Sequence, residues 1–250
     1  MNQSFFIGAV GAHQQLKRLT VHSNNIANVN TYAFKAEKPR FTALMYDNIR
    51  GIDNEMLPSG VGTALWTTDT NFSSGSLIST ERSQDYAIAG EGFFALADLS
   101  TGEISLTRNG AFVMSELERA TGELDENGVP VMEKIYYLSD NDGRFVLSQN
   151  GGMIEIDPAA RDEEQPVGVF DYINYNGMEH INDTRFLAVD KNGGIRNSDG
   201  KAISGMLEQS NADLAEEFSK VIEAQRAYGM ALKMVMTSDE IETTINSLSN

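Results

Sequence analysis

Both ends of the chain carry small and apolar residues at alternating steps of four and three, a spacing that restricts each end to a helix burying one stripe. We call the two stripes heptad seams. The first seam consists of Phe5, Ala9, Ala12, Leu16, Leu19, Ser23 and Ile26. The second follows residues able to cap a helix start (Ser210, Asn211 and Asp213) and consists of Leu214, Phe218, Val221, Gln225, Tyr228, Leu232 and Val235. Beyond Val235 the phase slips, and the T-x-x-E pattern from Thr237 to Glu240 offers a new helix start there.

The two ends also differ in the sign of their charge. Residues 1–40 have a net charge of about +4, from Lys17, Arg18, Lys35, Lys38 and Arg40 against Glu37. Residues 208–250 have a net charge of about −5. Opposite charge favours pairing of the ends with each other or with neighbouring copies, so we predict terminal helices that pair as a coiled-coil-like stem. The alternative is two amphipathic helices packed on one globular core.

The middle of the chain has the signals of β-hairpins. Asn-Gly and Asp-Gly pairs, which accept the positive φ angles of tight turns, recur at 109–110, 127–128, 142–143, 150–151, 176–177, 192–193 and 199–200. Runs with strand character lie between them, at 103–107, 153–156, 167–173 and 186–189. We therefore predict an α+β fold with a central all-β, hairpin-rich domain. The expected division is a terminal helical domain (1–35 and 208–250), an extended connector (36–80) and a β-rich domain (81–207).

Composition excludes several classes of partner. The formal charge of −17 argues against nucleic acid and against an acidic membrane surface, because both need a basic protein surface. The chain has no Cys, which excludes disulfides and thiolate chemistry. The apolar run from Phe5 to Ala12 contains two glycines and is preceded by no Lys or Arg. We therefore expect neither a membrane-inserted helix nor a cleaved signal peptide.

No pattern of catalytic or metal-binding residues stands out. His13 and His22 are nine residues apart, so they project from different faces of a helix and cannot share a metal. The segment from Gly194 to Lys201 has the wrong spacing for a phosphate-binding loop, and the acidic turns lack the Glu that closes a calcium-binding EF-hand loop. We predict no enzyme, no cofactor and no metal. A hydrolase using an unrecognised carboxylate pair stays open as an alternative, because the separation of carboxylates is a three-dimensional property.

Two terminal segments carry a family resemblance. SNNIANVNTYAFK, residues 23–35, resembles the N-terminal signature of the flagellar rod and hook protein family, at Asn25, Ala27, Asn28, Thr31, Phe34 and Lys35. Residues 207–240 resemble its C-terminal signature, at Ser210, Asn211, Glu216, Gln225, Arg226, Ala227, Tyr228 and Asp239. GEGFFAL (90–96), TRNGAF (107–112) and NGVPV (127–131) also fit, and LPSGVGT (57–63) favours distal-rod proteins. Ala33 departs from the family, which usually has Gly there, so the local turn must differ or be strained if that Gly has a positive φ.

The resemblance implies a structural subunit of the bacterial flagellar basal-body rod, the hollow drive shaft used in motility. Such proteins leave the cell through the flagellar type III export apparatus without a cleaved signal peptide, and self-assemble with copies of themselves and other rod and hook proteins. Their terminal helices line the axis and the β domain faces outward. The expected assembly interface is Leu16, Leu19, Asn25, Ile26, Asn28, Phe34, Phe218, Val221, Tyr228 and Leu232. The alternative function is a secreted, monomeric β-rich binding or adhesive module.

Overall fold

A computed structural model of the chain describes residues 3–44, 47–50, 56–60, 62–124, 130–157 and 163–248. Backbone contacts divide the chain into two compact units. Unit 1 is formed by Met1–Ala27, Ala36–Asn71 and Ala212–Asn250. Unit 2 is formed by Asn28–Lys35 and Phe72–Asn211. The chain therefore passes repeatedly between the two units, and both terminal segments belong to unit 1.

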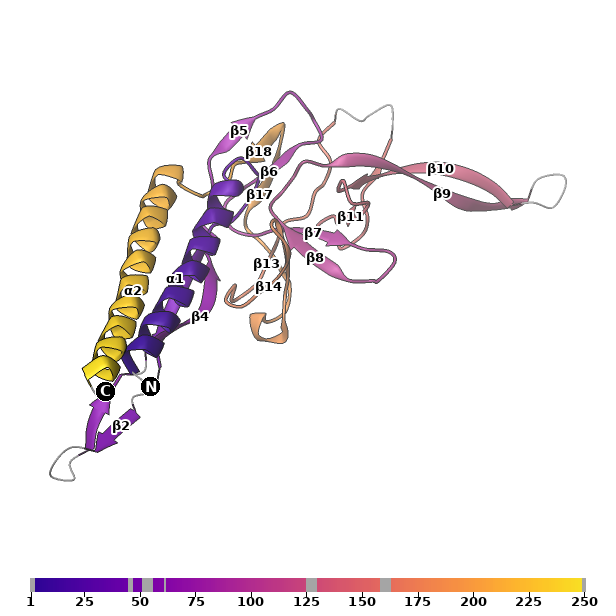
Figure 1. The fold of residues 1–250 in the computed structure, drawn as a ribbon. Helices are drawn as coiled ribbons and strands as arrows, with labels where there is room; N and C mark the ends of the chain where they lie inside the picture. Colours follow the sequence, from indigo (N-terminus) through magenta and orange to yellow (C-terminus); the bar gives the residue numbers. More distant parts are fainter. Residues whose placement is uncertain are drawn as a thin grey trace. The chain divides into compact units, whose positions relative to one another are not determined.

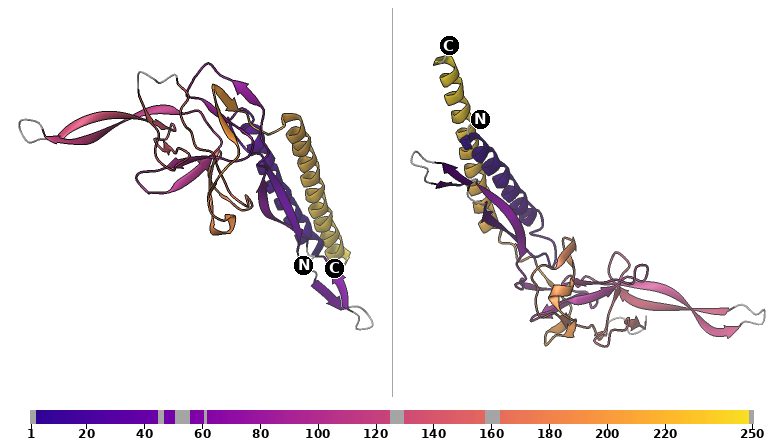
Figure 2. Two further views of the ribbon diagram at one scale, coloured as in Figure 1. Left: turned by 180° about the vertical axis from the view of Figure 1, so that it is seen from behind. Right: turned by 90° about the horizontal axis from the view of Figure 1, so that it is seen from below.

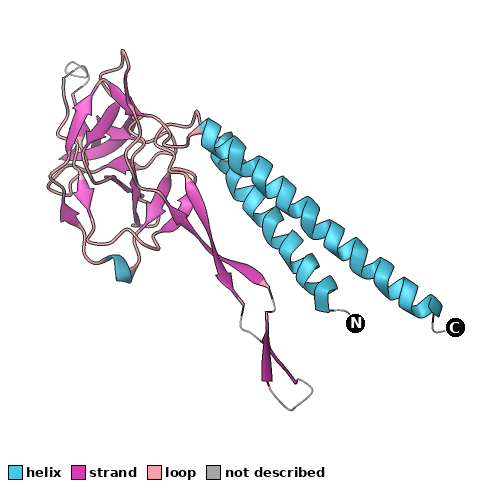
Figure 3. Cartoon of the chain, turned by 90° about the vertical axis from the view of Figure 1, so that its left-hand side faces the viewer, coloured by secondary structure: helices cyan, strands magenta, loops and turns pink. Residues whose placement is uncertain are grey.

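Unit 1 contains two long helices, α1 (Gln3–Ala27) and α2 (Leu214–Leu248), which lie side by side with the two chain ends at the same end of the pair (Figures 1 and 3). This confirms the predicted α+β class with paired terminal helices. The carboxylate of Asp213 accepts hydrogen bonds from the backbone N–H groups of Ala215 and Glu216, at 2.9 and 3.2 Å, and so caps α2 as the sequence predicts. The helix is continuous through Thr237 to Glu240, so the new start expected there is wrong: α2 needs no second cap.

The rest of unit 1 consists of strands beside α1. Strand β1 (Glu37–Ala43) pairs antiparallel with β4 (Thr63–Thr70), with a register shift between Arg40 and Phe41, and β2 (Asp47–Arg50) pairs with β3 (Met56–Ser59). Both β1 and β4 contact α1. The side-chain oxygen of Gln14 accepts a hydrogen bond from Leu65 N–H at 2.9 Å. Much of the range expected from the sequence to be an extended connector, 36–80, thus forms paired strands.

Unit 2 is built from short antiparallel strands, the largest sheet having the order β12-β10-β11-β7-β8-β15-β14, with β9 paired to β10. Smaller pairs are β18 with β5, β17 with β6, and β13 with β16. Strands β9 and β10 form a long two-stranded ribbon (Figure 2). The strands are β5 (Leu77–Ser79), β6 (Tyr86–Ala89), β7 (Phe94–Ala97), β8 (Ile104–Thr107), β9 (Val113–Leu124), β10 (Pro130–Ser139), β11 (Phe145–Val146), β12 (Glu155–Ile156), β13 (Phe170–Asp171), β14 (Glu179–Asn182), β15 (Arg185–Leu187), β16 (Arg196–Asn197), β17 (Lys201–Ser204) and β18 (Met206–Glu208).

The core of unit 2 lies on both faces of β7. Successive side chains of a strand point to opposite faces, so Phe94 and Leu96 join one apolar cluster, with Phe112 and Leu138 among its members. Their neighbour Ala95 joins a second cluster, which is built around Phe93, Leu106 and Phe186. Because both faces of β7 are covered, the FFAL part of GEGFFAL is a continuous apolar run and does not alternate between apolar and polar residues.

The turn glycines fall into two groups. Gly143, Gly151, Gly177 and Gly193 have positive φ angles, as the sequence predicts. The same expectation is wrong for Gly110 and Gly200, whose φ angles lie outside that range. A Cβ on Gly110 would lie 1.8 Å from the carbonyl oxygen of Tyr86, so glycine is required there by close backbone packing. The pair at 127–128 and part of LPSGVGT (57–63) lie outside the described residues.

Candidate assembly surface

The contact between α1 and α2 is made by small residues. Gly8, Ala12 and Ala224 are buried. A Cβ added to Gly8 would lie 3.0 Å from Cγ2 of Val235, and one added to Gly11 would lie 4.0 Å from Cβ of Ala231. The two helices therefore approach each other closely, and larger side chains at these positions would force them apart.

Polar pairs fix the antiparallel alignment of the two helices. Nδ1 of His22 lies 2.6 Å from a carboxylate oxygen of Glu217, and both side chains are buried. At the other end of the pair, the hydroxyls of Ser4 and Ser238 are 3.1 Å apart. Arg18 and Glu223 form an exposed ion pair at 3.0 Å. Burying Glu217 without His22 would leave a desolvated carboxylate without that partner, so this alignment is specific.

Each predicted seam is divided between the inside and the outside of the helix pair. Among the expected interface residues, Leu19 and Ile26 of α1 and Val221 and Tyr228 of α2 are half-buried. They lie on the side of the stripe that carries the buried small residues, since Leu19 and Ile26 follow Ala12 at steps of seven and Val221 and Tyr228 flank Ala224. Of the remaining seam positions, Ala12 is buried and Val235 is half-buried, and the others are exposed: Phe5, Ala9, Leu16 and Ser23 on α1, and Leu214, Phe218, Gln225 and Leu232 on α2.

The exposed half of the seams carries large apolar side chains. Leu16 is 46% exposed and Phe218 is 50% exposed. Further exposed apolar residues on α2 are Leu214, Ile222, Met230, Leu232, Met234, Met236, Ile241, Ile245 and Leu248. Apolar surface of this extent is uncommon on soluble monomers and marks interaction sites. Methionine side chains add adaptability, because they fill irregular gaps.

The three residues of the N-terminal signature that belong to the expected interface have roles inside the chain. Asn25 is fully buried in unit 1, where its side-chain amide donates to the carbonyl oxygen of Glu37 at 2.8 Å and its oxygen accepts from Glu37 N–H at 3.0 Å. In unit 2, Asn28 accepts a hydrogen bond from the hydroxyl of Thr31 at 3.0 Å, and Phe34 is buried. Asn25 and Phe34 therefore act on any assembly contact through the fold rather than by direct exposure.

A buried cluster of charged residues, which sequence reasoning missed, lies in unit 2. We call Lys35, Arg108 and Glu208 the Glu208 cluster. Nζ of Lys35 is 2.6 Å from Oε1 of Glu208, and Nη1 of Arg108 is 3.2 Å from Oε2. Lys35 also donates to the carbonyl oxygen of Ser73 at 2.8 Å. Each of the three residues belongs to a different segment that resembles the family, and only the fold brings the segments together.

The Glu208 cluster has two cations and one carboxylate. Desolvation by burial lowers the pKa of Lys35, although the charge of Glu208 opposes this effect. Arg108 is further held by carbonyl oxygens, since Nε donates to Gly92 at 2.8 Å and Nη2 donates to Gly90 at 2.5 Å. Removing Glu208 would leave two buried cations, whereas removing either cation would leave one neutral pair.

Ala33 adopts the backbone conformation that the family's glycine suggests. Its φ angle is +58°, a left-handed conformation unfavourable for residues with a Cβ. The residue is completely buried, and its N–H donates to the carbonyl oxygen of Glu208 at 2.8 Å. Of the two outcomes that the sequence left open, a different turn or a strained one, the structure shows the strained turn.

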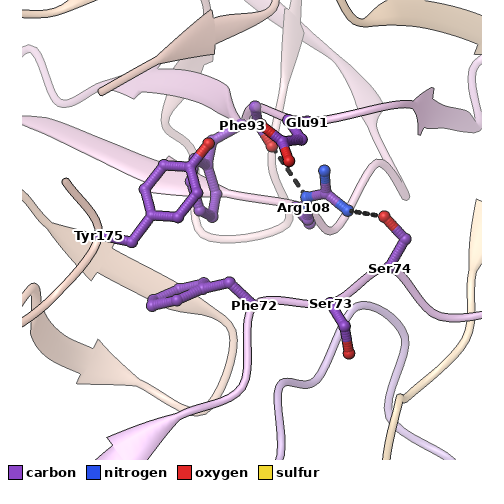
Figure 4. Close-up of a pocket in the computed structure, with 8 residues that line it drawn as sticks. Phe72, Ser73, Ser74, Glu91, Phe93, Arg108 and Tyr175 are labelled. Carbon is purple, nitrogen blue, oxygen red and sulfur yellow. Dashed lines mark hydrogen bonds between the residues drawn. The ribbon is translucent and has the colours of Figure 1, made fainter. Parts of the chain in front are cut away.

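A cavity of about 280 Å³ lies beside Arg108, lined by Phe72, Ser73, Ser74, Glu91, Gly92, Phe93, Arg108 and Tyr175 (Figure 4). The guanidinium of Arg108 is 5.8 Å from the ring centroid of Phe93, and Nη1 donates to the hydroxyl of Ser74 at 2.9 Å. Burial and a hydrogen bond to Asp171 raise the pKa of Tyr175. The guanidinium is already engaged by protein groups, so the cavity has the character of a packing gap beside the Glu208 cluster.

In the described part of the chain, no three His, Cys, Asp or Glu side chains gather in a way that could hold a metal ion. None of the described helices is long and apolar enough to cross a membrane.

Comparison with known proteins connects this geometry to a family. Residues 7–35 match the model of the flagella basal body rod protein, and residues 203–248 match that of the flagellar basal body rod FlgEFG protein C-terminal. The flagellar basal-body rod protein FlgG of Buchnera aphidicola subsp. Acyrthosiphon pisum (strain APS) is 30% identical over 99% of this chain and 100% of the relative. FlgG of Borreliella burgdorferi is 28% identical over 99% of both chains. The flagellar hook-basal body complex protein FlhP of Bacillus subtilis (strain 168) is 24% identical over 99% of this chain and 100% of the relative.

The two matched segments contain the halves of unit 1 that make the α1–α2 pair, together with Lys35 and Glu208. The match to whole-length relatives extends the similarity through unit 2. The chain belongs to the flagellar basal-body rod protein family, whose members are structural proteins.

Proposed function

We propose that the chain polymerises head-to-tail into the hollow axial rod through the exposed half of its two seams. The observation that carries the proposal is the division of each seam: small residues close the α1–α2 pair, while Leu16, Phe218 and other large apolar side chains remain exposed. Burying one such side chain contributes about 1.5–3 kcal/mol, so a few of them stabilise a contact between copies.

The end of α2 supports a head-to-tail arrangement. Helix α1 begins at Gln3, and Ser4 meets Ser238, so the last turns of α2 run beyond the start of α1 (Figure 2). Ile241, Ile245 and Leu248 are exposed on these turns. A contact between different surfaces of successive copies propagates into a helical polymer when its rotation does not close into a ring.

The remaining elements of the proposal follow from family membership. The helices of unit 1 would line the axis, and the β-rich unit would face outward. Partners are copies of this chain and other rod and hook proteins, and the subunit reaches the basal body through the flagellar export apparatus without a cleaved signal peptide. We favour a distal-rod position and a structural role without catalysis.

The test replaces neighbouring exposed residues of α2 by the same charged residue. Phe218→Asp places a carboxylate in the apolar surface, where burial in a contact between copies would desolvate it. Ser219→Asp adds the same charge one position along the helix, on another face. In the bacterium from which the chain comes, we expect Phe218→Asp to abolish swimming and to be missing from purified basal bodies. Ser219→Asp should retain both.

The folded state of the variants is checked on purified protein by circular dichroism and urea denaturation. Normal incorporation of Phe218→Asp would contradict the proposed surface. If the unaltered chain is absent from basal bodies and stays monomeric at all concentrations in sedimentation velocity, a secreted monomeric β-rich module becomes the better explanation.

A further inference from the structure

The segments by which the chain passes between the two units are bonded to each other inside unit 2. The chain passes between the units after Ala27, after Lys35, before Phe72 and after Asn211, and the last three of these passages are bonded to one another. The N–H of Asn211 donates to the carbonyl oxygen of Phe34 at 3.3 Å, and its side-chain amide donates to the carbonyl oxygen of Ser73 at 2.9 Å. Lys35 donates to the same oxygen of Ser73 at 2.8 Å. Three of the four passages are therefore joined by direct hydrogen bonds.

Glu208 is the charged centre of this arrangement. Its carboxylate accepts hydrogen bonds from Lys35 at 2.6 Å, from the N–H of Gly75 at 2.7 Å and from Arg108. Its carbonyl oxygen accepts from the N–H of Ala33. Glu208, at the start of the C-terminal signature, thus contacts the N-terminal signature and the segment that begins at Phe72.

We propose that the Lys35–Glu208 pair is a clasp, a pair of positioning residues that holds the two chain ends together so that α1 and α2 can pair. All of unit 2 lies between the two helices in sequence, so bringing them together has a loop-closure cost in entropy. Small residues make the closest contacts of α1 with α2, and each of them buries less apolar area than a large side chain to offset this cost. A clasp folded within unit 2 supplies the proximity instead, as a high effective concentration of one helix near the other. The inference concerns a single chain and is independent of polymerisation.

Two variants of the Glu208 cluster separate a clasp from a general contribution to stability. Lys35→Met and Arg108→Met each remove one buried cation and leave one neutral pair with Glu208. They differ in position: Lys35 lies at a passage between the units, whereas Arg108 follows β8 and holds the carbonyl oxygens of Gly90 and Gly92. A clasp requires Lys35 but not Arg108 for pairing of the helices.

Helix pairing is measured by disulfide formation between cysteines introduced by Gly11→Cys and Ala231→Cys. The chain has no cysteine of its own. The 4.0 Å between the Cβ built on Gly11 and that of Ala231 falls within the range of about 3.5–4.5 Å found in disulfides. We expect Lys35→Met to slow this cross-link at least about tenfold, because the effective concentration falls, and Arg108→Met to change it by less than about twofold. Hydrogen exchange of β6 to β8 should still show a folded unit 2 in both variants.

Three outcomes overturn the clasp. The first is an unchanged cross-linking rate in Lys35→Met. The second is an equal loss in both variants, which would make the cluster a general stabiliser of unit 2. If Lys35→Met unfolds unit 2, Asn211→Ala decides, because it removes the side-chain contact to Ser73 without disturbing a buried charge. The clasp predicts that Asn211→Ala slows the cross-link about threefold with β6 to β8 protected, and an unchanged rate overturns it.

Discussion

The two units differ in whether large or small residues are buried at their main contacts. Unit 2 has a core of large apolar side chains that are almost completely buried, such as Phe94, Leu106 and Phe186. The helix pair of unit 1 buries Gly8 and Ala224 at its contact and exposes most of its large apolar residues. The first arrangement completes a core within one chain, while the second leaves apolar surface of the kind that marks interaction sites.

The buried polar residues of unit 1 determine which of its segments meet. In unit 1 the helices are aligned by His22 with Glu217 and are attached to the strands by Asn25 and Gln14. Buried polar pairs add little net stability but discriminate between alternative alignments. Unit 1 thus has an interior that specifies which segments meet, and most of its large apolar side chains lie outside that interior, where the proposed assembly would bury them.

The largest expected difference in the free energy of unfolding is between two variants that each replace one phenylalanine, one from each unit. Phe94→Ala should lower the free energy of unfolding of unit 2 by about 3–5 kcal/mol, because it opens a cavity in a fully buried core. Phe218→Ala should change monomer stability by less than about 0.5 kcal/mol, since half of the side chain already faces solvent. Urea denaturation followed by circular dichroism measures both. A large loss for Phe218→Ala would remove the contrast between the units, because that side chain would then support the fold of the monomer.

An intermediate effect is expected for glycines within the two helices. Gly8→Leu should destabilise the α1–α2 pair by about 1–3 kcal/mol, because even the first added carbon would lie 3.0 Å from Val235. Gly229→Leu is the matched control, because a Cβ at Gly229 meets nothing within 4 Å. That change should stabilise α2 by about 0.5–1 kcal/mol through helix propensity. Thermal unfolding of the helical circular dichroism signal tests both, and equal effects would show that the close approach at Gly8 is unimportant.

The sequence predicts elements better than it predicts which residues meet. Spacing and charge identify both helices, and Asn-Gly and Asp-Gly pairs identify the β-rich middle. The seam period is also present in the structure, but periodicity alone does not say which half faces the partner helix. Steps of three and four define a broad stripe, and the close contact formed on its small-residue side. The Glu208 cluster was beyond sequence reasoning, because its three charges come from distant segments that only the fold of unit 2 joins.

The smallest expected effect is at Ala33, the position at which the sequence indicated a different or strained turn. A left-handed conformation costs a residue with a Cβ about 1–2 kcal/mol, and a substitution by glycine relieves this strain. Ordering the more flexible glycine costs about 0.5–1 kcal/mol in entropy, which offsets part of the gain in stability. Ala33→Gly should therefore stabilise the protein by about 0.5–1 kcal/mol in urea denaturation. Ala36→Gly, at a buried alanine without a positive φ, should instead destabilise it by about 1 kcal/mol.

A destabilising Ala33→Gly would mean that packing of the fully buried methyl group outweighs the backbone strain. Ala33 is hydrogen-bonded to Glu208, at the place where the two terminal signatures meet. The strained residue therefore lies next to the clasp, in unit 2, which has a buried apolar core. The left-handed residue lies in the segment 28–35, which belongs to unit 2, and such a conformation persists only where the surrounding structure holds the residue in place.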